Sequence, residues 1–120
     1  MELLIQVLIG LVAALHGYFL WLEMFAWTTR GKKVFKNFPP ELFEPTRALA
    51  ANQGLYNGFL AAGLLWTFFI SDEAWQSHVA AFFLGCIAVA GIYGALSADK
   101  KIFWVQAAPA LLALALLLLR

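Results

Sequence analysis

The chain has 120 residues, of which 63% are hydrophobic and only 12% are charged. Soluble domains are about 45–50% apolar, and one this small cannot bury so much apolar surface, so the composition indicates a single domain within a membrane. The net charge of +1 gives no reason to expect nucleic acid as a partner, and a lone cysteine, Cys86, excludes a disulfide within the chain.

Four apolar segments, separated by turn signals, are long enough to cross about 30 Å of hydrocarbon as helices. They cover about residues 3–27, 48–70, 79–97 and 102–119. The first is too long for a signal peptide and lacks a basic start, so we expect it to stay in the protein as a spanning helix. The predicted fold is therefore all-α, an antiparallel bundle of four transmembrane helices in one domain over residues 1–120.

The loops between these segments differ in charge, and this difference predicts the orientation of the chain. The first loop carries Arg30, Lys32, Lys33, Lys36 and Arg47, the third carries Lys100 and Lys101, and the second carries no Lys or Arg. Because positively charged loops stay in the cytoplasm, we expect both termini to face outward. For a bacterial protein, the expected location is the inner (plasma) membrane.

The first loop also contains "VFKNFPPELFEP", which mixes apolar and basic residues. This mixture is typical of a segment that lies among lipid headgroups, where it could cover a site as a lid. A short helix could begin at Pro40, since proline suits the first helical position. An anchor for anionic lipid built from the basic residues is at least as well supported. The apolar residues concerned are Phe35, Phe38, Leu42 and Phe43.

Polar residues occur at matching depths in the four segments. Each segment has one such residue four positions inside its cytoplasmic end, about 6 Å below the boundary. We expect these side chains to face one another rather than lipid, because unsatisfied polar groups are costly there. The four residues are Glu23, Asn52, Tyr93 and Gln106.

A second polar layer is expected deeper in the membrane. His16 precedes Glu23 by seven residues, so both share a helical stripe and lie about 10 Å apart along the axis. Tyr56 and Asn57 follow Asn52 and Gln53 by one turn. Together these residues predict a polar funnel that opens to the cytoplasm. The alternative is that the amides only join helices, at about 0.6 kcal/mol per hydrogen bond.

Gly54 and Gly58 form a G-x-x-x-G pair within the second segment. Small residues at this spacing let two helices approach closely, and packing is the expected role of the pair. A homo-oligomer formed through the same two glycines is a further expectation.

The polar funnel predicts a site for a small lipophilic or lipid-like molecule. If the protein is an enzyme, which stays open, Glu23 and His16 are the expected catalytic acid–base pair. The expected ligand-binding residues are Asn52, Gln53, Tyr56, Asn57, Tyr93 and Gln106. Two alternatives remain: a small proton-coupled transporter, and a structural or regulatory membrane subunit.

Bound metals and cofactors are not expected from the motifs. Seven residues separate His16 from Glu23, too far for the pair to share a metal without ligands from other segments. The chain also lacks the C-x-x-C and H-E-x-x-H spacings of strong metal sites and the glycine-rich motifs of nucleotide binding.

Four stretches carry a resemblance to a known family: "LHGYFLWLEMFAW", "NQGLYNGFLAAG", "AGIYGA" and "VQAAPA". With H-x6-E followed by N-Q-G-x-Y-N-G, the chain resembles the small bacterial membrane proteins known only as a domain of unknown function, the "DUF thirteen-oh-four" group. The resemblance covers nearly the whole chain. It implies an integral membrane protein with four spans and supplies no activity.

Overall fold

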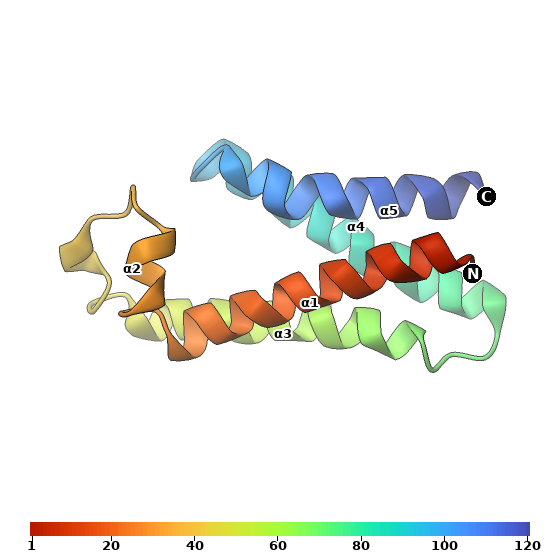
Figure 1. Cartoon of the computed structure of the whole chain (residues 1–120), viewed down its shortest axis with the longest axis horizontal. Coiled ribbons are helices and arrows are strands. Elements are labelled where there is room, and N and C mark those ends of the chain that lie inside the picture. The colour runs from red at the N-terminus through yellow and green to blue at the C-terminus, as the bar shows by residue number, and fades with distance from the viewer. The chain divides into compact units, whose positions relative to one another are not determined.

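The computed structural model describes residues 1–120 and contains helices and turns but no strand, which confirms the all-α prediction (Figure 1). The elements are α1 (Leu3–Phe25), α2 (Arg30–Val34), η1 (Pro40–Leu42), α3 (Arg47–Thr67), α4 (Glu73–Ser97), η2 (Phe103–Ala107) and α5 (Ala108–Leu119). The short helix η1 begins at Pro40, as expected for a proline at the first helical position.

The four predicted segments coincide with α1, α3, α4 and the continuous pair η2–α5. Only α1 and α4 are both long and apolar enough to cross a membrane, while η2 and α5 form a shorter apolar helix over Phe103–Leu119. Helix α3 has sufficient length, 21 residues, but its amides lower its apolar character. By length and composition the structure therefore contains two candidate membrane spans.

Helix α4 begins at Glu73 rather than near residue 79. Asp72 caps it, because the Asp72 carboxylate accepts a hydrogen bond from the backbone N–H of Trp75 at 3.0 Å. A polar capped turn therefore precedes the apolar part of this helix.

The chain divides into two compact units, one over Ala14–Ala61 and the other over Met1–Ala13 with Ala62–Arg120. In the first unit, α1 and α3 pack closely at Gly54. A Cβ atom added there would lie 2.9 Å from Met24 Cγ and 3.1 Å from the carbonyl oxygen of Leu20. Gly58 also packs against Leu20. The glycine pair therefore serves helix packing within the chain, and self-association through it stays a prediction.

The segment between α1 and α3 folds around an aromatic core. Phe43 is fully buried, and its ring centroid lies 4.9 Å from those of both Trp27 and Phe38. The indole N–H of Trp27 donates to the Thr46 hydroxyl at 3.0 Å, which fixes the core near the start of α3. The expectation that Phe43 lies among lipid headgroups is wrong, because this side chain instead forms the centre of the folded segment. We call this structure, residues 27–46, the aromatic cap.

In the second unit, α4 packs against η2 and α5. A Cβ atom at Gly91 would lie 2.5 Å from the backbone nitrogen of Ala107 and 2.8 Å from its Cα, so the two backbones nearly touch. Residues 103–107 form a π-helix, in which the N–H of Ala108 donates to the carbonyl oxygen of Phe103. Pro109 explains this turn, because proline has no N–H for the carbonyl four residues earlier and its ring crowds that carbonyl.

Candidate functional site

The carboxylate of Glu23 is the centre of a polar contact between α1 and α3. Glu23 is only 6% exposed, although it lies in the last turn of α1. Its Oε2 atom accepts a hydrogen bond from Gln53 Nε2 at 2.9 Å, and its Oε1 atom accepts one from Asn57 Nδ2 at 2.6 Å. We call these three residues the carboxylate–amide cluster.

The sequence of α3 explains why both amides reach one carboxylate. Gln53 and Asn57 are one helical turn apart, so their side chains share a face. Each is followed by a glycine, and Gly54 brings the α3 backbone so close that an added Cβ would lie 3.0 Å from the Cβ of Glu23. The repeated amide–glycine pair thus lets the α3 backbone approach α1 and supplies two hydrogen-bond donors to the Glu23 carboxylate.

The other two polar residues predicted on α3 are not among the hydrogen-bond donors to Glu23. The Asn52 side chain donates to the carbonyl oxygen of Ala48 in its own helix at 2.8 Å. Tyr56 is 59% exposed, and its ring lies 6.0 Å from that of Phe59. Both residues are exposed and lie within one helical turn of Gln53 on α3.

His16 lies deeper along α1 and is fully buried. Its ring meets the ring of Phe19 edge-on, with centroids 5.3 Å apart. Because seven residues of helix separate it from Glu23, a distance of about 10 Å lies between their positions along the axis. An acid–base pair formed by the two would therefore act at two separate points of a bound molecule.

Tyr93 and Gln106 belong to the second compact unit. Tyr93 is 70% exposed on α4, and Gln106 is half-buried in the π-helix. The expected layer that joins these residues to Glu23 and Asn52 stays a prediction.

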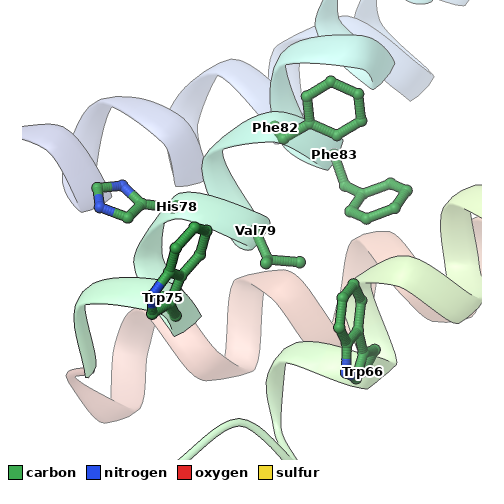
Figure 2. Close-up of a pocket in the computed structure, with 6 residues that line it drawn as sticks. All are labelled: Trp66, Trp75, His78, Val79, Phe82 and Phe83. Carbon is green, nitrogen blue, oxygen red and sulfur yellow. The ribbon is translucent and has the colours of Figure 1, made fainter. Parts of the chain in front are cut away.

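Two surface hollows lie in the second unit, and neither is lined by a residue of the carboxylate–amide cluster. The first lies between the end of α3 and the start of α4, and Figure 2 shows Trp66 on the former helix and the other lining residues on the latter. It is lined by Trp66, Trp75, His78, Val79, Phe82 and Phe83. The second hollow follows α4 beside Cys86. Sequence reasoning missed the first hollow, although paired tryptophans at adjoining ends of two segments are a signal that could have indicated it.

The chemistry of the cluster rests on hydrogen bonding. No group of three or more His, Cys, Asp or Glu side chains converges in the chain. Beyond its bond to Glu23, each amide has a second N–H and a carbonyl oxygen, so the cluster offers both donors and acceptors to a polar group. Both carboxylate oxygens of Glu23 have hydrogen-bond partners, and no buried side-chain nitrogen or oxygen is left without one.

Comparison with known proteins places the chain among small bacterial proteins. It is similar to the uncharacterised protein YpaA of Lactococcus lactis subsp. lactis (strain IL1403), with 34% identity over 116 residues that cover 95% of this chain and 96% of that protein. No solved structure matches the chain significantly. The model of the family described as "Protein of unknown function (DUF1304)" matches residues 10–118. The chain therefore belongs to the DUF1304 family.

Proposed function

We propose that this protein is an integral membrane protein with four spanning helices, in which the carboxylate–amide cluster binds the polar group of a small lipophilic molecule. The observation that carries the proposal is the burial of Glu23, 6% exposed, on a helix apolar enough to cross a membrane. An acidic side chain within a spanning helix is costly and is therefore a functional-site hypothesis by default.

The lengths of the remaining helices support four spans. Helix α3 has 21 residues, and at 1.5 Å per residue it reaches about 30 Å, the thickness of the hydrocarbon core. The apolar helix over Phe103–Leu119 is near the lower limit of about 17 residues for a spanning helix. The amides that lower the hydropathy of α3 include the two that bond to Glu23, so their cost in a membrane is partly offset within the protein.

The ligand we propose has a polar head and an apolar body. Its head would exchange hydrogen bonds with the carboxylate and the amides, entering past the exposed side chains of Asn52 and Tyr56. Its apolar body would lie against the helices, toward the depth of His16. If the protein acts on this molecule, Glu23 and His16 are the groups we expect to move protons.

The charge of the loops supports an orientation with both termini outside the cell and the aromatic cap in the cytoplasm, across a bacterial plasma membrane. Single-cysteine labelling in a Cys86→Ala background tests this. Cysteines placed at Lys33 and Lys100 should react only from the cytoplasm, and one placed at Ser77 only from outside. Labelling of position 77 from the cytoplasm would contradict the orientation.

One observation favours a structural role for the same residues. Both oxygens of Glu23 already accept hydrogen bonds from amides of the chain, as they would in a cluster that only joins α1 to α3. The two roles predict different results when the charge is removed, because a purely structural cluster affects stability, whereas a binding site affects ligand retention.

The deciding experiment compares Glu23→Gln and His16→Asn with the native protein. Melting temperature in detergent and the amount of co-purified small molecule, measured by native mass spectrometry, are recorded for each. We expect ligand retention to fall sharply while the melting temperature changes little or rises. Glu41→Gln, which alters an exposed acid of the cap, is the control and should change neither quantity. Lower melting temperatures with unchanged ligand would refute the binding site.

A further inference from the structure

The outer surface of the aromatic cap carries a concentration of positive charge. Four basic side chains within seven positions are exposed, and no acidic residue lies between residues 24 and 40. Arg47 is a separate case, because its guanidinium pairs with the Glu44 carboxylate at 3.1 Å. We call the exposed group the basic patch; it consists of Arg30, Lys32, Lys33 and Lys36.

The fold holds this patch at the end of α1. Gly31 in α2 is buried, and its N–H donates to the carbonyl oxygen of Ala26 at 2.8 Å. The carbonyl oxygen of Gly31 in turn accepts from the N–H of Phe35 at 2.9 Å. A Cβ at Gly31 would lie 3.3 Å from the Trp27 ring, so α2 sits directly on the aromatic core. Phe43 is fully buried and Trp27, Phe35 and Phe38 are half-buried, whereas the four basic side chains are exposed.

We infer that the basic patch binds the anionic phospholipid headgroups of the leaflet in which α1 ends. This inference rests on α1 crossing the membrane, as proposed above. The patch begins at Arg30, five positions beyond the last residue of α1, Phe25, so its charges lie beside the headgroups and within the roughly 8–10 Å over which salt leaves electrostatic attraction effective.

The arrangement favours a lipid surface over a soluble anion. Binding of a small anion requires donors that converge on one point, whereas these side chains are all exposed along a short helix and the turn after it. A sheet of anionic headgroups matches charges that are spread over a surface. The burial of Phe43 also favours an anchor over a lid, because the residue expected to insert among headgroups is inside the cap.

The test uses two matched pairs of adjacent lysines in the full chain. Lys32→Gln/Lys33→Gln removes two charges from the patch, and Lys100→Gln/Lys101→Gln removes two from the loop before η2. In that loop Asp99, whose carboxylate accepts from the backbone N–H of Lys101 at 2.9 Å, already offsets part of the charge. Binding of phosphatidylglycerol and of phosphatidylcholine with the same acyl chains is measured by native mass spectrometry of the protein in micelles.

We expect the native protein to bind phosphatidylglycerol more tightly than phosphatidylcholine. The Lys32/Lys33 variant should lose about fivefold in phosphatidylglycerol affinity per charge at low salt, and the Lys100/Lys101 variant distinctly less. Equal binding of the two lipids, or equal loss in the two variants, would overturn the inference. Competition by millimolar inorganic phosphate would also overturn it, by indicating a soluble anion.

Two further variants separate this inference from the proposed function. Glu23→Gln should leave the preference for phosphatidylglycerol unchanged, because Glu23 is buried in the carboxylate–amide cluster and not in the patch. Lys36→Gln changes a single exposed side chain, so it should not disturb folding. It should also lower the affinity for phosphatidylglycerol. A lipid preference that falls with Glu23→Gln and not with Lys36→Gln would contradict the assignment to the patch.

Discussion

Two helix contacts in this molecule use a glycine to bring two backbones close together. They differ in the side chains that lie next to that glycine. Where α1 meets α3, Gly54 lets the backbones approach, and a buried carboxylate with two amides lies alongside. Where α4 meets η2 and α5, Gly91 lies against the backbone of Ala107, and the other buried residues of these helices are alanine, leucine and isoleucine. The second contact shows that this chain can join helices closely without any acid.

The difference bears on the role of Glu23. Van der Waals packing of small residues is a sufficient basis for helix association in a membrane, and interhelical hydrogen bonds add only about 0.6 kcal/mol each on average. A buried ion or polar cluster is often no more stabilising than well-packed apolar side chains of similar volume. We therefore expect the contact between α1 and α3 to hold without the carboxylate–amide cluster.

The largest loss of unfolding free energy is expected from a substitution at the contact without polar groups, between α4 and η2. Gly91→Ala places a methyl group against backbone atoms of Ala107 that cannot move independently, and we expect a loss of about 3 kcal/mol in unfolding free energy. Gly85→Ala in the same helix is the control. No atom lies within 4 Å of its added Cβ, so alanine should be neutral or stabilise by up to about 1 kcal/mol. The unfolding free energies of both variants are measured in mixed micelles by circular dichroism. Equal losses in the two variants would contradict the close contact assigned to Gly91.

A smaller loss of unfolding free energy is expected from a substitution in the carboxylate–amide cluster. Asn57→Ala removes the donor to Glu23 Oε1 and should cost about 1–3 kcal/mol, because a buried acceptor loses its partner. In a double-mutant cycle, Asn57→Ala and Glu23→Gln should couple by about 0.5–3 kcal/mol. Asn52→Ala, whose side chain bonds within its own helix, is the matched control and should be additive with Glu23→Gln. Coupling to Asn52 instead of Asn57 would show that the cluster is assigned to the wrong amide.

The smallest change in unfolding free energy is expected when the whole cluster is replaced, and this variant tests the comparison of the two helix contacts most directly. Replacing all three members of the cluster, Glu23→Leu with Gln53→Leu and Asn57→Leu, should change the unfolding free energy by less than about 1 kcal/mol or raise it. Ligand retention should be lost at the same time. A triple variant that fails to fold would mean that α1 and α3 depend on the polar contact and that the two helix contacts are not equivalent.

The sequence was sufficient to predict the four long helical segments and the packing of Gly54 and Gly58, because long apolar runs and a four-residue spacing are local signals; it did not predict α2 or the first turns of α4. It identified Glu23 and the amides as polar groups at similar depth but selected Asn52 as the partner. Counting from the end of a segment gives depth and not direction, and adjacent residues on a helix differ by about 100° around the axis. Asn52 and Gln53 are therefore equivalent by depth, and only the structure shows that Gln53 faces Glu23.

Burial of Phe43 could not be predicted for a related reason. Its position among basic residues resembles that of an interfacial aromatic, and its inward direction depends on Trp27, sixteen positions earlier in the sequence. A contact of that kind depends on the path of the whole loop rather than on any local pattern.

The π-helix before α5 has a consequence for the rotational phase of that helix. Ile102 meets Gly94, and Ala107 meets Gly91. In a regular α-helix, residues five positions apart differ by about 140° around the axis, so they could not both face α4. A π-turn pairs each residue with the fifth one along, which brings both onto the same side. The π-helix thus sets the rotation of α5 about its own axis, and with it which side chains of α5 are buried: Ala110, Ala113 and Leu117.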